Sequence, residues 1–108
     1  KYGFYVIDES DIECHGVVCR NGGYDNQFYG NIASDLRFAP AILDRIQKNV
    51  MRDKNRPCVI MWSMGNESGF GECFVRAGKW VKSYDSSRLL HYENILGYRR
   101  YKRDVFFT

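Results

Sequence analysis

The sequence predicts an α/β fold in which three parallel strands alternate with two helices, in the order βαβαβ. Short apolar runs in residues 4–7, 59–62 and 89–94 have the length and composition of strands. Between them lie two longer stretches whose apolar residues recur at helical spacing. Strands alternating with helices favour right-handed crossovers and a parallel sheet.

The first strand is expected at Phe4–Ile7, and it runs into an acidic loop that ends at Gly16. In this loop Glu13 and His15 are two residues apart, so on an extended backbone both side chains point to the same side. A Glu-x-His pair of this kind can share a divalent cation with a third ligand. The alternative is an ordinary solvated acidic loop, because the pair alone is a weak signal.

The first helix is expected to begin at Asp35, after an irregular Gly-, Asn- and Tyr-rich loop over residues 19–34. Such long loops are uncommon in compact domains and often bind ligands or cover sites. The helix should end before Asn55, because Pro57 follows and residues preceding proline disfavour the helical region. Its predicted buried stripe consists of Ala39, Ile42, Leu43, Ile46 and Val50.

The second strand, at Val59–Trp62, is expected to be buried on both faces, as in a parallel sheet. The run is bounded by Pro57 and Gly65, and Asn66 and Glu67 follow. In α/β barrels the chemistry lies at the carboxyl ends of the strands. An ionisable group next to a core is costly unless it is paired, so Glu67 is the leading candidate for a functional residue.

The second helix is expected after residues 68–72 and is closed by residues 85–87. Its predicted buried face consists of Phe74, Ala77, Val81 and Tyr84, with Trp80 alongside. The third strand, residues 89–94, has a polar end. There, His91 is either a substrate contact or a structural histidine, and the structural role is favoured. Residues 105–107 are consistent with the start of another strand.

At 108 residues the chain is one small domain or a piece of a larger one. Its net charge of +3 is too small to indicate nucleic-acid binding. Residues 97–103 interleave aromatic with basic side chains, and we interpret them as a solvated loop rather than a nucleic-acid patch. No apolar stretch is long enough to span a membrane. We therefore expect neither nucleic acid nor membrane as a partner.

The four cysteines favour free thiols in a reducing compartment, and hence a cytoplasmic location. The alternative is a zinc site, because Cys14 and Cys19 flank His15. A compact second pair of ligands is missing from the sequence around them, so free thiols are preferred.

Four segments together resemble glycoside hydrolase family 2, and specifically its large bacterial β-galactosidases. They are Tyr2–Glu9, Ile12–Gly16, Arg52–Pro57 and Trp62–Gly69. The resemblance covers nearly the whole chain and is weakest over residues 19–34, so residues 1–108 are expected to be one fragment of the catalytic domain. It implies the catalytic (β/α)₈ barrel. Such a barrel has eight strands and about 250 residues, so three strands in 108 residues are less than half of one.

The resemblance also implies roles for individual residues. Glu67 matches the general acid/base, and Asn66 matches the amide that hydrogen-bonds the sugar. Glu13, His15 and Glu67 match the ligands of an active-site Mg²⁺. Because Mg²⁺ prefers oxygen ligands, one imidazole in its shell is unusual.

Retaining glycosidases need a second carboxylate as nucleophile, which the resemblance places beyond Thr108; Glu93 does not match it. We therefore expect an internal fragment of a retaining β-galactosidase that acts on terminal β-D-galactosides and is inactive alone. Its partners should be the β-galactoside, the rest of the parent barrel and, through unpaired sheet edges, other copies of itself. The alternatives are a fragment of a family 2 β-glucuronidase and a non-catalytic binding or assembly module.

Overall fold

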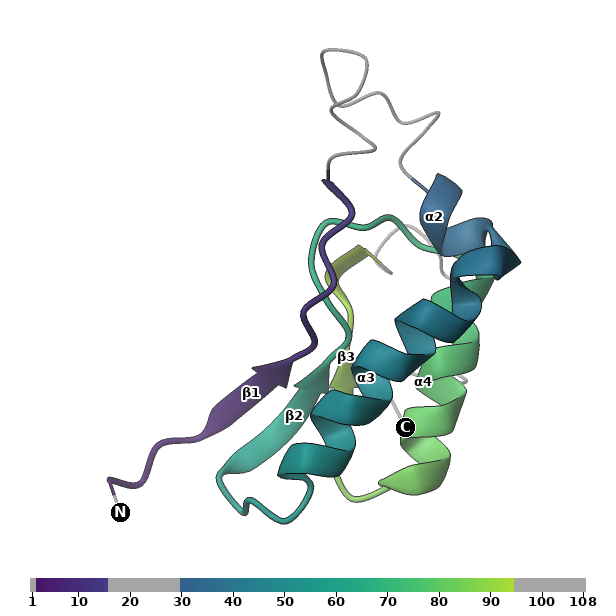
Figure 1. Cartoon of the computed structure of the whole chain (residues 1–108). Coiled ribbons are helices and arrows are strands. Elements are labelled where there is room, and N and C mark those ends of the chain that lie inside the picture. Colours follow the sequence, from purple (N-terminus) through teal and green to yellow (C-terminus); the bar gives the residue numbers. More distant parts are fainter. Residues whose placement is uncertain (1, 16–29, 95–108) are drawn as a thin grey trace.

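The computed structural model describes residues 2–15 and 30–94, which form a three-stranded parallel sheet backed by helices (Figure 1). The strands are β1 (Val6–Glu9), β2 (Val59–Ser63) and β3 (Leu89–His91), in the order β1-β2-β3. Both pairings are parallel. The prediction of three parallel strands in an α/β fold is confirmed. The first strand lies two residues later in the sequence than expected. The third strand ends at His91, three residues earlier than expected, so Glu93 and Asn94 lie beyond it.

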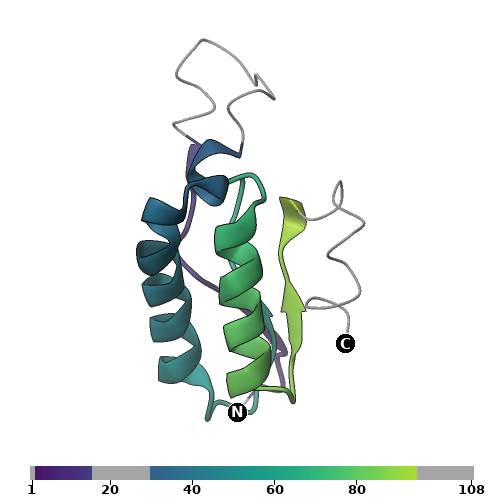
Figure 2. The same ribbon diagram turned by 90° about the vertical axis from the view of Figure 1, so that its right-hand side faces the viewer.

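Two long helices, α3 (Ala39–Asp53) and α4 (Glu72–Tyr84), run side by side and cover one face of the sheet (Figure 2). The apolar residues of α3 meet those of α4 because each helix has one apolar stripe. The helix α3 ends at Asp53, before Asn55 and Pro57, as expected. The helix α4 ends at Tyr84, and the backbone N–H of the next residue, Asp85, donates to the Val81 carbonyl.

The start of the first helix differs from the prediction. Asp35 accepts a hydrogen bond from the Arg37 backbone N–H at 3.0 Å, but it caps a short 3₁₀ helix, η1 (Leu36–Phe38). The helix α3 begins only at Ala39, with Pro40 in its first turn, where the missing N–H of proline costs nothing. Before η1 lies α2 (Asn31–Ser34), within the segment expected to be irregular; residues 16–29 lie outside the described residues.

The strand β2 contains a bulge, and its buried and exposed residues do not alternate regularly. Val6 pairs with Val59 and Ile7 with Met61, so Ile60 is an extra residue on β2. Trp62 is buried, but Ile60 is 42% exposed. The expectation that this strand is buried on both faces is therefore wrong for the described residues, because the helices cover only one face of the sheet and leave Ile60 exposed.

The core lies between the helices and the covered face of the sheet. Trp62 and Leu90 supply its sheet side, and the Phe74 ring stacks on Tyr92 with centroids 4.3 Å apart. Tyr84 is exposed and stacks on Trp80 at 4.8 Å, contrary to its predicted burial. The helix residues that complete the core are Ile42, Ile46, Val50, Cys73, Val75, Ala77 and Val81.

The opposite face of the sheet carries a row of apolar side chains that no described helix covers. Ile7, Met61 and Leu89 are register partners across the three strands, and Leu89 is 55% exposed. In a (β/α)₈ barrel this face points inward and is filled by side chains from the other strands. Three parallel strands with helices on one face and an open apolar row on the other are consistent with part of such a barrel.

The amino-terminal edge of the sheet is held by an ion pair between Asp85 and Arg88. Asp85 accepts hydrogen bonds from Arg88 at 2.6 Å and from the Trp62 indole at 3.0 Å. Burial of Asp85 disfavours its charge, but hydrogen bonds from Ser87, Arg88 and Trp62 outweigh this and hold the pKa of Asp85 well below its usual range. Arg88 also donates to the Val59 carbonyl at 2.7 Å.

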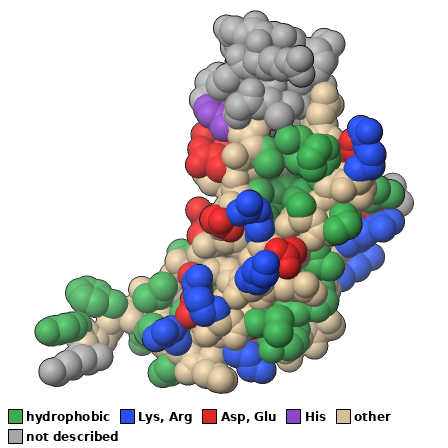
Figure 3. All heavy atoms as spheres, viewed as in Figure 1, with side chains coloured by type: hydrophobic (Ala, Val, Ile, Leu, Met, Phe, Trp, Pro, Cys, Tyr) green, Lys and Arg blue, Asp and Glu red, His purple; other side chains and the backbone are tan. Residues whose placement is uncertain are grey.

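Acidic and basic side chains alternate over the surface of α3, and hydrophobic side chains gather near the amino terminus (Figure 3). Cys14, Cys58 and Cys73 are free thiols.

The predictions made for Cys19, residues 97–103 and residues 105–107 lie outside the described part of the chain. Among the described helices, none is long and apolar enough to cross a membrane.

Candidate functional site

The candidate site forms at the carboxyl edge of the sheet, where the segments that follow β1, β2 and β3 converge. Asn66 forms an isolated parallel bridge with Glu13, and its backbone N–H donates to the Ile12 carbonyl at 2.8 Å. The Cys14 N–H donates to Ser68 Oγ at 2.8 Å. These bonds extend the parallel ladder past the strands and bring the first acidic loop beside the second.

Glu67 has a left-handed backbone, with φ of 38°, and is the one non-glycine residue of this kind in the described chain. Gly65 and Gly69 on either side of it also have positive φ, at 139° and 69°. A left-handed conformation costs a non-glycine residue on the order of 1–3 kcal/mol and persists only where surrounding contacts impose it. The backbone at Glu67 is therefore strained at the residue that carries the candidate carboxylate.

Glu13, His15 and Glu67 come together as a three-residue cluster. One ligand atom from each lies within 4.8 Å of the others, and His15 Nε2 is 3.4 Å from Glu67 Oε2. Octahedral Mg²⁺ ligands at about 2.1 Å from the ion are about 3–4 Å apart, so the cluster needs only a small contraction. Two carboxylates and one imidazole suit a divalent cation, and both Glu67 and His15 are half-buried.

Asn66 is half-buried beside this cluster, and its backbone position is fixed by the bridge to Glu13. His91 is exposed at the end of β3, and its carbonyl accepts a hydrogen bond from the Met64 N–H at 3.0 Å. The sequence-predicted residues Glu13, His15, Asn66 and Glu67 therefore all lie at the carboxyl edge.

Sequence reasoning missed three residues that hold the loop after β2. Glu93 Oε1 accepts a hydrogen bond from the Glu67 backbone N–H at 2.7 Å. Asn94 Oδ1 accepts bonds from the N–H groups of Ser68 and Gly69, both at 3.0 Å. Ser68 Oγ donates to the Asn66 carbonyl at 2.8 Å. The polar end of the third strand was the available signal, but nothing in it indicated that it binds the Glu67 loop.

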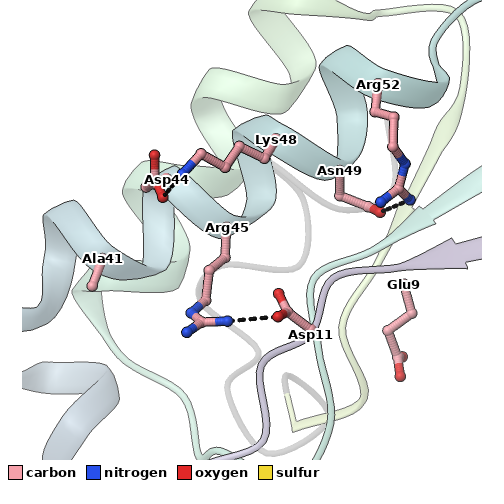
Figure 4. Close-up of a pocket in the computed structure, with 8 residues that line it drawn as sticks. All are labelled: Glu9, Asp11, Ala41, Asp44, Arg45, Lys48, Asn49 and Arg52. Atoms are coloured by element: carbon pink, nitrogen blue, oxygen red, sulfur yellow. Dashed lines mark hydrogen bonds and ion pairs between the residues drawn. The ribbon is translucent and has the colours of Figure 1, made fainter.

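A cleft of about 570 Å³ lies away from this cluster, between α3 and the residues that follow β1 (Figure 4). Two ion pairs span its lining: Arg45 donates to Asp11 at 2.6 Å, and Lys48 donates to Asp44 at 2.8 Å. Arg52 donates to Asn49 at 2.9 Å at the far end. Since Arg45 and Lys48 are already paired with acidic side chains, the cleft is a weaker candidate than the carboxyl edge.

Next to this cleft, the carboxyls of Asp8 and Asp53 share an environment between β1 and α3. Burial and the neighbouring Asp53 raise the pKa of Asp8. Hydrogen bonds from Arg52 and Arg56 hold the pKa of Asp53 well below its usual range. Asp53 therefore stays ionised, and Asp8 is the member of the pair that takes up a proton more readily.

The chain matches the family model described as "Glycosyl hydrolases family 2, TIM barrel domain" over residues 1–106. It is 46% identical over 96 residues to the β-galactosidase of Staphylococcus xylosus, covering 89% of this chain and 10% of that protein. It is 43% identical over 117 residues to the β-galactosidase of Actinobacillus pleuropneumoniae, covering 87% of this chain and 11% of that protein.

The chain spans about a tenth of the length of these curated relatives. The family match and the sheet agree, because three parallel strands with helices on one face are what part of a TIM barrel contains. The chain belongs to glycosyl hydrolase family 2, as part of its TIM barrel domain.

Proposed function

We propose that the chain forms part of the active site of a retaining β-galactosidase, with Glu67 as its general acid/base and terminal β-D-galactosides as substrates. The observation that carries the proposal is the position of Glu67, at the carboxyl edge of the sheet and 3.4 Å from His15. The β-galactosidase relatives support the choice of a galactoside rather than a glucuronide.

In a retaining glycosidase one carboxyl group protonates the leaving oxygen and later takes a proton from the attacking water. We assign both transfers to Glu67, whose strained backbone projects the side chain from the loop after β2. Asn66 precedes it and is half-buried, so its amide is available to hydrogen-bond the sugar next to the scissile bond. The two adjacent residues thus orient the galactoside and transfer the proton.

We further propose that Glu13, His15 and Glu67 hold Mg²⁺. The support is the 4.8 Å cluster and its oxygen-rich donor set. When bound, the cation supplies positive charge that offsets the repulsion between the two carboxylates. Glu13 and His15 would also fix the Glu67 side chain in one orientation.

The nucleophile is proposed to come from outside this chain, with the rest of the parent barrel. Consequently the 108-residue polypeptide alone should not hydrolyse galactosides. Its open apolar row, Ile7, Met61 and Leu89, is then the surface that the other strands cover. In isolation the polypeptide should associate with itself, and sedimentation as a clean monomer at micromolar concentration would contradict this.

The proposal is tested by a hybrid in which this chain replaces its aligned segment in the Staphylococcus xylosus β-galactosidase. We expect the hybrid to hydrolyse aryl β-galactosides at least 100-fold faster than aryl β-glucuronides. Glu67→Gln should lower kcat by about 10²–10⁴-fold, the usual contribution of general acid/base catalysis. The loss should be largest for galactosides with poor leaving groups, because these need the proton most.

Glu72→Gln is the matched control, because Glu72 lies in the first turn of α4 and pairs only with Arg76 among its described contacts. Glu13→Gln distinguishes the role of Glu13 from that of Glu67. Mn²⁺ replaces Mg²⁺ as a probe because it can be measured by electron paramagnetic resonance. The substitution should weaken Mn²⁺ binding without altering the dependence of the rate on the leaving group. A Glu67→Gln hybrid that keeps kcat within tenfold on a poor leaving group would overturn the assignment. If the hybrid does not fold, Mn²⁺ binding is measured on the 108-residue chain instead. Loss of binding in Glu13→Gln would support the proposed cation site, and unchanged binding would contradict it.

A further inference from the structure

We infer that Glu93 is a positioning residue for Glu67: its carboxylate holds the strained Glu67 backbone that keeps the acid/base facing Glu13 and His15. The inference rests on the role proposed above for Glu67. Glu93 comes from the segment that follows β3, and it reaches across 26 residues of sequence to accept the Glu67 N–H at 2.7 Å.

The bond is needed because the Glu67 backbone is not held by a regular ladder. Its φ of 38° is unfavourable for a residue with a side chain, and the flanking Gly65 and Gly69 leave the loop free to adopt other conformations. The side-chain oxygen of Glu93 gives the Glu67 N–H a hydrogen-bond acceptor in this left-handed geometry, and an amide oxygen at the same reach can serve as that acceptor too. Glu93 therefore opposes relaxation of Glu67 to a negative φ.

The neighbouring N–H groups are held from the same direction. Those of Ser68 and Gly69 both donate to Asn94 Oδ1 at 3.0 Å. Three successive N–H groups thus point at side chains that follow β3. Successive N–H groups around a left-handed residue form an anion-binding concavity, and here Glu93 and Asn94 fill it.

The other side of the loop is fastened to the segment after β1. Ser68 Oγ accepts from the Cys14 N–H at 2.8 Å, and the Asn66 N–H donates to the Ile12 carbonyl at 2.8 Å. The loop is therefore clamped between its two neighbours, and the Glu67 carboxylate reaches His15 at 3.4 Å. Glu93 contributes to the clamp through the Glu67 backbone, so we assign it no proton transfer.

The test compares two substitutions of Glu93 in the hybrid enzyme. Glu93→Ala removes the acceptor and should lower kcat by about 10–100-fold, because small misplacements of a catalytic group are costly. KM should change less than threefold. Glu93→Gln keeps a carbonyl oxygen at the same reach and should retain kcat within about threefold. The Mn²⁺ affinity should follow the same order, since Glu67 belongs to the cluster.

A readout independent of activity is hydrogen exchange of the Glu67 amide in the ¹⁵N-glutamate-labelled 108-residue chain. We expect Glu93→Ala to accelerate it at least tenfold, and Glu93→Gln to change it little. If Glu93→Ala does not fold, Glu93→Asp replaces it; the shorter side chain should give an intermediate loss of kcat and of amide protection.

The outcomes separate the two proposals. An active parent whose Glu93→Ala variant keeps kcat and Mn²⁺ affinity overturns the positioning role alone. Equal losses in Glu93→Gln and Glu93→Ala overturn it too, because they would point to the charge rather than the acceptor. A parent hybrid that folds but neither hydrolyses galactosides nor binds Mn²⁺ overturns the function proposed for Glu67, and this inference with it.

Discussion

The two edges of the sheet differ in how their charged side chains are paired. At the amino-terminal edge Asp85 is 10% exposed and accepts from Arg88 and Trp62, and Arg88 in turn donates to backbone carbonyls. At the carboxyl edge the carboxylates of Glu13 and Glu67 crowd one imidazole, and the Glu67 backbone is strained. At the amino-terminal edge an acidic group is paired with a basic one, whereas at the carboxyl edge two acidic groups lie close together.

This contrast indicates which edge stabilises the fold and which is available for chemistry. A buried pair that is fully hydrogen-bonded is costly to break, because the remaining partner keeps an uncompensated charge. Crowded carboxylates and a positive φ lower stability and are retained where function requires them. Substitutions at the amino-terminal edge should therefore affect stability, and those at the carboxyl edge chiefly activity and cation binding.

The largest effect on stability is expected from Asp85→Ala. It leaves the Arg88 guanidinium and the Trp62 indole N–H without this acceptor, and should lower the free energy of unfolding by about 3–5 kcal/mol. Urea unfolding followed by tryptophan fluorescence measures it. Glu67→Gln is the control from the other edge and should change the free energy by less than 1 kcal/mol. Equal losses in the two variants would remove the contrast.

Gly65→Ala should disturb the carboxyl edge itself. The φ of Gly65 is 139°, and an added Cβ would lie 2.7 Å from the Ile12 carbonyl oxygen. We expect a loss of about 1–3 kcal/mol from strain and overpacking, accompanied by weaker Mn²⁺ binding. Gly3→Ala is the matched control: its φ is also positive, but no heavy atom lies within 4 Å of the added Cβ. Unchanged Mn²⁺ affinity in Gly65→Ala would argue against the clamp.

The Asp8–Asp53 pair lies between the two edges and should give opposite pH dependences. The raised pKa of Asp8 means that its ionised form destabilises the fold; its favourable contribution is complete below about pH 3.9 and is lost as pH rises through the folded pKa. Asp8→Asn should therefore raise Tm at pH 7 and leave it unchanged at pH 3.

Asp53 has a lowered pKa, so its contribution is present above about pH 3.9 and is lost as pH falls through the folded pKa. Asp53→Asn should accordingly lower Tm at pH 7, with a smaller loss in acid. Thermal unfolding at both pH values tests the pair. Changes of the same sign in the two variants at pH 7 would contradict the assignment of the proton to Asp8.

The smallest effect is expected from Arg45→Ala, which removes the exposed pair with Asp11 in the charged cleft. Exposed ion pairs contribute about 0–1 kcal/mol and are screened by salt. Urea unfolding at low and at high salt should show a difference that shrinks with salt. A loss above 2 kcal/mol would mean that the cleft contributes more to stability than its exposure suggests.

Much of the fold could be predicted from the sequence because the apolar patterns are local. The stripe of Ile42, Ile46 and Val50 indicated α3, and the run that ends at Trp62 indicated β2. The convergence of Glu13, His15 and Glu67 was expected from the family resemblance, and the structure brings the three together. Their catalytic and metal-binding roles stay predictions.

What could not be predicted depends on contacts between distant residues. The bulge at Ile60 comes from register against β1, which no local pattern specifies. Tyr84 was expected in the core from its spacing, but it stacks on Trp80 instead. The bond from the Glu67 N–H to Glu93 depends on a left-handed backbone, which the sequence does not show in a residue other than glycine.

The clamp on Ser68 also has a consequence for how the molecule assembles. Its bond to Asn94 closes 26 residues of chain, whereas its bond to Cys14 closes 54. Doubling a loop adds about 0.6 kcal/mol of closure entropy, and pairings between distant residues slow folding. We expect the unit of β2, α4 and β3 to form first, with Glu67 already in its loop. Glu13 and His15 would then arrive with β1 in the last step, so a cation that bridges them to Glu67 would favour completion of folding.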